Sequence, residues 1–180
     1  MRLPLTGALL LTLAACGSAE PGMTPLIIPG LSGAPRDVNI VARDYAYVPS
    51  VVDLVPGETV MFHVINGGLD VHEAIIGDID TQLAWEAAEG AFVDRPPGPT
   101  PVVSLGPEFG GLRIVIASGQ RLDVTWTVPD DAAQDTGGWF VGCHIPGHWQ
   151  KGMVVPVRFV GRDGTPLGSV PPLPIPTPGG

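Results

Sequence analysis

The most informative stretch of the chain is CHIPGHWQKGM, which covers Cys143–Met153. A thiol, an imidazole and a thioether follow one another there at intervals of five residues, on Cys143, His148 and Met153. A trigonal set of two histidines and a cysteine, with a weak axial methionine, is typical of a blue-copper site. The stretch therefore predicts a copper site that needs one further histidine from elsewhere in the chain.

That further histidine must come from a small set. The chain has four histidines, and they are His63, His72, His144 and His148. His72 follows a Gly-Gly turn at the start of a predicted strand, where a side chain could face the late loop. His63 lies in the middle of a predicted strand, where a packed or half-exposed histidine is the better interpretation. His144 is interpreted as a polar loop residue that points away from the metal, so His72 is the best-placed candidate.

The first residues have the features of a bacterial export signal. Arg2 precedes the short apolar run Leu5–Leu13, which is far below the roughly 20 residues that a spanning helix needs. Small residues before Cys16 are similar to a lipobox, so we predict a signal peptide over residues 1–15 and a lipid on Cys16. An ordinary signal peptide that is cleaved near Ala15 is the alternative. A lipidated Cys16 would leave Cys143 without a disulfide partner, and metal ligation would explain an unpaired thiol in an exported protein.

Length and composition indicate one domain that is rich in turns. The chain has 180 residues, of which 25 are glycine and 21 proline, and its net charge is −9. This charge excludes a general binder of nucleic-acid backbones. Eight segments have the character of short strands and predict an all-β Greek-key sandwich. They are Val38–Ala42, Val51–Val55, Thr59–Asn66, Val71–Ile76, Leu112–Ala117, Arg121–Val128, Gly138–Cys143 and Met153–Val160.

The strand pattern is interrupted once and has irregular segments on both sides. Residues 77–111 form a predicted insertion, in which Thr81–Glu89 could be a short helix with Trp85, Ala88 and Phe92 inward. The insertion could shape a partner surface or serve as a structural cover. We expect a flexible tether over residues 16–36, the sandwich domain over 37–161, and a Pro-rich disordered tail over 162–180.

The spacing of the late loop resembles that of the cupredoxins. The motif Cys-x4-His-x4-Met, with Ile-Pro-Gly before the histidine and Gly before the methionine, is most similar to rusticyanin- and sulfocyanin-type members and to plastocyanin-like single-domain members. The resemblance covers about residues 37–161. It implies one type 1 copper, held by four ligands. They are His72, Cys143, His148 and Met153.

The resemblance also concerns two neighbours of the ligands. It implies an electron exit at His148, beside Trp149. Small blue-copper proteins often have an asparagine after the early histidine, which donates a hydrogen bond near the cysteine sulfur. Here that residue is Glu73, whose ionised side chain only accepts hydrogen bonds. The environment of the thiolate is therefore expected to differ from that in small blue-copper proteins, and the reduction potential of the copper is expected to differ as well.

Several functions are compatible with a single copper ion. We expect an electron carrier, not an enzyme, that is anchored outside the cytoplasmic membrane, acts as a monomer and meets redox partners with basic patches. Copper handling or resistance without redox turnover is the alternative, and a metal-free adhesive or structural sandwich is a third. An oxidase is disfavoured because the chain has no His-x-His pair for a copper cluster. Zinc could bind cysteine and histidine, but the axial methionine favours copper.

Overall fold

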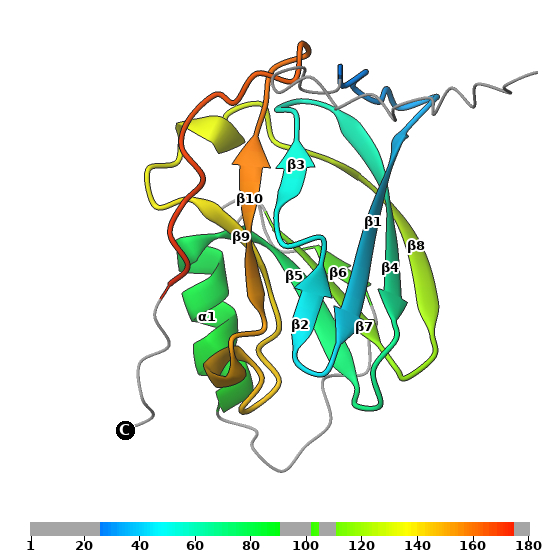
Figure 1. Cartoon of the computed structure of the whole chain (residues 1–180), viewed down its shortest axis with the longest axis vertical. Helices are drawn as coiled ribbons and strands as arrows, with labels where there is room; N and C mark the ends of the chain where they lie inside the picture. Colours follow the sequence, from blue (N-terminus) through cyan, green and yellow to red (C-terminus); the bar gives the residue numbers. More distant parts are fainter. Residues whose placement is uncertain (1–25, 91–101, 105–110, 175–180) are drawn as a thin grey trace, which may run out of the picture.

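The computed structural model describes residues 26–90, 102–104 and 111–174 (Figure 1). Two β-sheets pack face to face, and the helix α1 (Ile79–Gly90) lies along one side of them. The predicted signal peptide, Cys16 and Phe92 lie outside the described residues. Within the described part of the chain, no helix has the length and apolar character needed to cross a membrane.

The first sheet has four strands in the order β2-β1-β4-β8. Their bounds are β1 Arg36–Arg43, β2 Ala46–Val48, β4 Thr59–Asn66 and β8 Arg121–Thr127. The central pair β1 and β4 is parallel, whereas β2 and β8 pair antiparallel with their neighbours. Since β4 and β8 are neighbours that lie far apart in sequence, the sheet has the long connections that Greek-key folds require.

The second sheet has six strands in the order β3-β10-β9-β5-β7-β6. Their bounds are β3 Val52–Leu54, β5 His72–Asp78, β6 Val102–Ser104, β7 Leu112–Ile116, β9 Trp139–Gly142 and β10 Val154–Phe159. Only β3 and β10 pair in parallel. The predicted all-β sandwich is confirmed, and each of the eight predicted segments contains a strand. The short strands β2 and β6 are additional.

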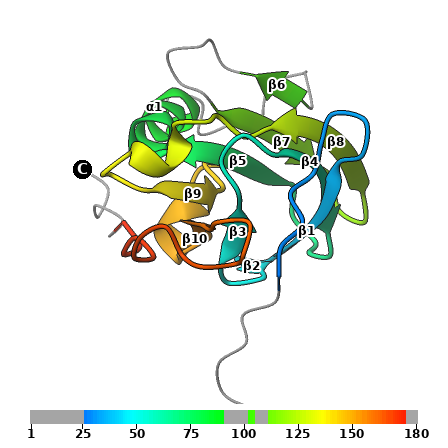
Figure 2. The same ribbon diagram turned by 90° about the horizontal axis from the view of Figure 1, so that it is seen from above.

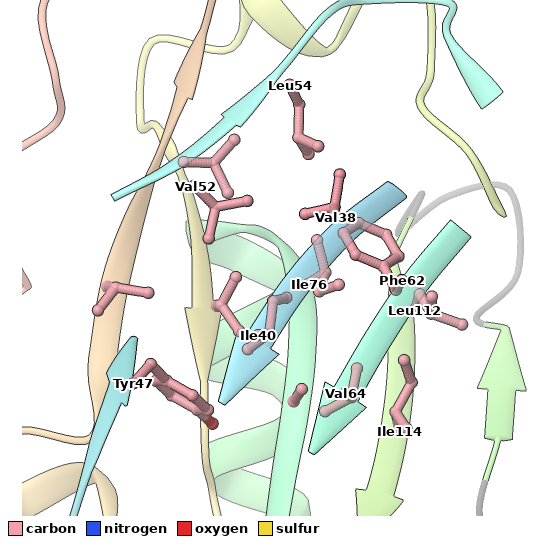
Figure 3. Packing of buried hydrophobic residues seen from close by; sticks show 14 of the residues in the cluster. Val38, Ile40, Tyr47, Val52, Leu54, Phe62, Val64, Ile76, Leu112 and Ile114 are labelled. Atoms are coloured by element: carbon pink, nitrogen blue, oxygen red, sulfur yellow. The ribbon is translucent and has the colours of Figure 1, made fainter. Parts of the chain in front are cut away.

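The core lies between the two sheets, as Figure 3 shows. Alternate residues of β1 and β4 face it, including Ile40, Phe62 and Val64, which are completely buried. Ile76 of β5 and Ile114 of β7 meet them from the other sheet and are also completely buried. This alternation is the pattern that a half-buried strand requires, because successive side chains point to opposite faces of a sheet.

The helix covers the predicted segment, but its inward face differs from the expected one. Ala88 is exposed, so its predicted inward position is wrong, while Thr81, Gln82 and Glu89 are buried. The reason is that α1 packs on strands whose carbonyls need partners. Gln82 Nε2 donates to the carbonyl of Ile75 at 3.0 Å, and a polar residue therefore serves better than alanine on this face.

Both segments that flank the domain make contacts with it. Gly30, in the predicted tether, is buried, and its carbonyl accepts the Thr59 N–H at 3.0 Å. In the predicted tail, the Leu167 N–H donates to the Phe159 carbonyl at 2.9 Å. Figure 2 shows the tail as the orange-to-red segment beside β10.

Candidate metal centre

Three predicted ligands meet at one end of the sandwich. His72 is the first residue of β5, while Cys143 and His148 belong to the loop between β9 and β10. Their ligand atoms all lie within 4.8 Å of one another, and all three side chains are buried. His72 Nδ1 is 3.3 Å from His148 Nδ1, and the same His148 nitrogen is 3.3 Å from Cys143 Sγ.

These separations fit a metal ion. Typical metal–nitrogen and metal–thiolate bonds are about 2.05 and 2.3 Å long in sites of this kind. With such bonds, the two distances of 3.3 Å correspond to angles of roughly 105° and 100° at the metal. These angles lie in the tetrahedral to trigonal range, and imidazole with thiolate suits copper. The spacing of these donor atoms therefore fits a metal site.

The loop holds the fourth predicted ligand, Met153, beside the other three. Met153 is completely buried. The Cys143 N–H donates to its carbonyl at 3.1 Å, and its own N–H donates to the His148 carbonyl at 3.2 Å. Gly147 and Gly152 have φ angles of 87° and 88°, which favour glycine and allow the loop to close. Together with His72, the loop residues form a type-1-copper-like site.

The thiol has a hydrogen-bond donor from an unexpected atom. The backbone N–H of Glu73 donates to Cys143 Sγ at 3.3 Å. The sulfur therefore receives a hydrogen bond from the main chain of Glu73, although its side chain cannot donate one. Burial raises the pKa of the Cys143 thiol to about 12, and this N–H opposes the shift. The bond favours the thiolate, which is the metal-binding form.

The side chain of Glu73 turns away from the sulfur into a buried ion pair. Arg113 of β7 donates its Nε–H to Glu73 Oε1 at 2.9 Å and contacts Glu89 of α1 at 3.2 Å. Its guanidinium also lies 4.8 Å from the centre of the Trp85 ring. Burial raises the pKa of Glu73 to about 7, and the charge of Arg113 opposes this shift. Glu73 is therefore held in place by its main-chain N–H and by its side-chain carboxylate.

His72 is oriented by a carboxylate. Its Nε2–H donates to Asp44 Oδ1 at 2.7 Å, which leaves Nδ1 free to bind a metal. The Leu69 N–H donates to the other oxygen of Asp44 at 2.8 Å and holds the pKa of that carboxyl below its usual value. Asn66 fixes the same turn, because its side chain donates to the Asp70 carbonyl at 2.7 Å.

An aromatic ring covers the outer side of His148. The Tyr45 ring lies 4.8 Å from the His148 ring, and Lys151 Nζ lies 3.6 Å from the centre of the Tyr45 ring. The Tyr45 hydroxyl donates to Asp70 at 2.7 Å. His148 is consequently only 7% exposed.

The remaining predicted residues lie outside the metal-ligand group. Trp149, predicted beside an electron exit, is buried and stacks on the His144 ring at 4.5 Å. His144 is also buried and hydrogen-bonded to Glu86 of α1. His63 lies on the outer face of the first sheet, where it contacts Asp37 and Asp123.

Sequence reasoning missed several residues around the site. They are Asp44, Tyr45, Gln82, Glu86 and Arg113. Arg113 carried a usable signal, because a single arginine inside the apolar strand Leu112–Ile116 predicts a buried acidic partner. The others stand in polar or mixed segments that have no distinguishing pattern.

Comparison of the sequence with known proteins identifies relatives that are named for copper. The chain is 29% identical over 146 residues to the copper-resistant cuproprotein CopI of Rubrivivax gelatinosus, and the match covers 77% of this chain and 79% of that protein. It is 25% identical over 141 residues to the CopI of Pseudomonas aeruginosa, with 67% of this chain and 74% of that protein covered. No protein-family model matches the chain.

Solved structures share the fold at low sequence identity. Reduced auracyanin from Roseiflexus castenholzii has a TM-score of 0.55 at 17% identity, and the match covers 72% of this chain and all of that one. Auracyanin B gives 0.53 at 18%, with 78% of this chain and all of the other covered. An azurin from Methylomonas sp. strain J gives 0.52 at 14%, with 71% and 100% covered. The chain therefore has a cupredoxin fold, and its type-1-copper-like site lies at one end of that sandwich.

Proposed function

We propose that this chain is an extracytoplasmic copper-binding protein that serves copper handling or resistance. His72, Cys143, His148 and Met153 would hold one copper ion. The observation that carries the proposal is that His72, Cys143 and His148 are buried with their ligand atoms within 4.8 Å of one another, while Met153 is buried in the same loop and the Tyr45 ring lies against His148. Such a site holds an ion out of contact with solvent. The likeness to two CopI proteins that are named for copper resistance supports this use.

Two residues beside the ligands would favour copper binding. Asp44 fixes the orientation of His72, and the Glu73 N–H stabilises the thiolate once Cys143 has given up its proton. The bound copper would supply a centre that exchanges one electron between its two oxidation states. Nothing in this proposal requires turnover of a substrate, so we propose a non-enzymatic role.

Electron transfer, which the sequence predicted, is the second candidate. Two imidazoles and a thiolate suit both oxidation states of copper, and the fold is shared with blue-copper proteins. The net charge of −9 would favour partners with basic patches. We rank this candidate second because the relatives are named for copper resistance and because the Tyr45 ring beside His148 favours retention of the ion.

The location of the protein is part of the proposal. The basic and apolar start of the chain supports export, and the small residues before Cys16 support a lipid anchor. Mass spectrometry of the protein from its native membrane tests both points. An acylated N-terminal Cys16 is expected, whereas a mature chain that starts elsewhere and has no lipid would contradict the anchor.

Copper loading of the purified full-length protein tests the central claim. We expect one copper per chain and an intense visible thiolate-to-copper absorption, both of which His72→Ala and Cys143→Ala remove. The matched control His63→Ala, on the outer face of the first sheet, should keep both. Loss of copper tolerance in cells that lack the gene, restored by the wild type but not by Cys143→Ala, would support copper handling. Normal tolerance together with a lost respiratory activity would instead support electron transfer.

A further inference from the structure

One carboxylate of the helix α1 contacts the ligand loop on both sides of His148. Glu86 Oε2 accepts a hydrogen bond from His144 Nδ1 at 2.7 Å, and Glu86 Oε1 accepts one from Gln150 Nε2 at 2.5 Å. His144 follows the ligand Cys143 directly, and Gln150 comes two residues after the ligand His148. The helix therefore contacts the loop at two points, one on each side of the ligand His148.

A second residue of the helix, one turn earlier, ties the same loop to the sheet. Gln82 is completely buried and donates from Nε2 to the carbonyls of Ile75 and Phe140 at 3.0 and 3.1 Å. Because these bonds fix the orientation of its amide, Gln82 Oε1 must accept, and it receives the His144 Nε2–H at 2.8 Å. His144 is thus hydrogen-bonded to α1 through both ring nitrogens.

Gln82 and Trp149 pack so closely against Gly142 of β9 that there is no room for a side chain at that position. A Cβ atom at Gly142 would lie 2.4 Å from Gln82 Oε1 and 2.7 Å from the Trp149 ring. Trp149 in turn stacks on His144, with 27° between the two ring planes. Helix, strand and loop are therefore packed against one another around the residue that follows the cysteine ligand.

We infer that Glu86 and Gln82 are positioning residues that hold the loop of Cys143, His148 and Met153 in its metal-binding form before copper arrives. This inference rests on the proposed function. It gives the helical insertion a role in the metal centre, in addition to covering the sandwich. Residues that orient metal ligands from outside the ligand set commonly change metal affinity about 10- to 100-fold when they are lost.

The test compares substitutions on one helix. Glu86→Ala removes both contacts with the loop, and Glu86→Gln retains a group that can bond to both partners, because its amide can donate to a neutral His144 and its oxygen can accept from Gln150. Leu83→Ala is the matched control, since Leu83 is 54% exposed on the same helix. All variants are made in the full chain and compared with the wild type.

The first measurement uses metal-free protein, so it does not depend on copper binding. The amides of Lys151 and Met153 both donate to the His148 carbonyl, and their hydrogen exchange reports whether the loop is closed. Glu86→Ala should accelerate their exchange about tenfold, while Leu83→Ala and Glu86→Gln should leave it near the wild-type rate. Unchanged exchange in Glu86→Ala would overturn the inference, whatever the result of copper loading.

The second measurement uses the copper-loaded protein. Glu86→Ala should shift the thiolate-to-copper absorption and speed copper loss to a chelator at least tenfold, with Glu86→Gln close to the wild type. If Glu86→Ala has the same absorption spectrum and the same rate of copper loss as Leu83→Ala, the helix only covers the sandwich and does not position the loop. If the wild type itself takes up no copper, the proposed function fails, and the exchange experiment still decides the role of Glu86 in the loop.

Discussion

Asp44 and His72 are joined by a hydrogen bond of 2.7 Å that fixes which imidazole nitrogen faces the other ligands. Three strands, β2, β3 and β4, separate the two residues in the chain, so the bond also ties the turn between β1 and β2 to the start of β5. A carboxylate behind a histidine ligand raises the basicity of the ring and holds its orientation. The same carboxylate accepts the Leu69 N–H, so the loop that precedes His72 depends on it as well.

Substitution of Asp44 tests this relationship. Asp44→Ala is expected to weaken copper binding about 10- to 100-fold, because His72 would lose its orienting acceptor. Asp44→Asn retains an acceptor oxygen for His72, so its copper affinity should fall much less. Competition with a chelator of known affinity measures both, and Asp130→Ala, an exposed aspartate beyond the opposite end of β4 and β8, is the control. Equal affinities in Asp44→Ala and Asp130→Ala would contradict the role of Asp44.

The cover over His148 predicts a kinetic effect. Removal of the Lys151 ammonium from the Tyr45 ring in Lys151→Gln would lose a cation–π contact worth about 0.5 to 1 kcal/mol, and copper release should become about two- to fivefold faster. Tyr45→Ala removes the ring itself and should have a larger effect. Stopped-flow measurement of copper transfer to a chelator gives both rates. Tyr45→Phe keeps the ring, so a release rate as fast as that of Tyr45→Ala would show that the ring is not the barrier.

The buried ion pair beside the thiol predicts a large loss of stability. In Arg113→Met the buried Glu73 would lose its partner and would have to remain charged or bind a proton, and the free energy of unfolding should fall by about 3 to 5 kcal/mol. Denaturant unfolding of the metal-free protein at pH 8 measures this loss against a wild type whose Glu73, with a pKa of about 7, is ionised. In the variant the charge that opposes the effect of burial is gone, so the pKa of Glu73 should rise and the buried carboxyl should take up a proton. Arg158→Met is the matched control, since Arg158 and Asp53 form a pair that is about one-third exposed, and it should cost about 0 to 1 kcal/mol.

The sequence identified the strands and the late loop because both carry short-range patterns. Alternation along β1 and β8 specifies a face without reference to any other strand, and Cys143, His148 and Met153 lie within one loop. His72 could be proposed only because the alternatives were few and because a strand start can face a loop. These features depend on local spacing, which a single sequence displays directly.

Residues that orient the ligands could not be found in the same way. Asp44 reaches His72 only after β1, β4 and β5 have been placed in the two sheets, and Glu86 reaches His144 only after α1 has packed on β5 and β9. The inward position of Ala88 was mispredicted for a related reason. An apolar face was expected, but the surface beneath the helix offers main-chain carbonyls and a buried histidine, and so it selects Gln82.

His63 predicts a pH dependence of stability that is independent of the metal centre. Hydrogen bonds to Asp123 and Asp37 raise the pKa of His63 above 6.5, although the nearby Arg121 opposes the shift. A raised folded-state pKa means that the stabilisation is fully present below about pH 6.5 and is lost as the pH rises through the folded-state pKa. The melting temperature of the wild type should therefore exceed that of His63→Gln by most near pH 5.5, and the difference should shrink above neutral pH. The pKa of the Asp123 carboxyl is lowered by Arg121 and His63, so at pH 5.5 this carboxyl is still ionised and can form an ion pair with protonated His63. The measurement uses metal-free protein from pH 5.5 to 9. A constant difference in melting temperature over this range would show that the contribution of His63 to stability does not depend on its protonation.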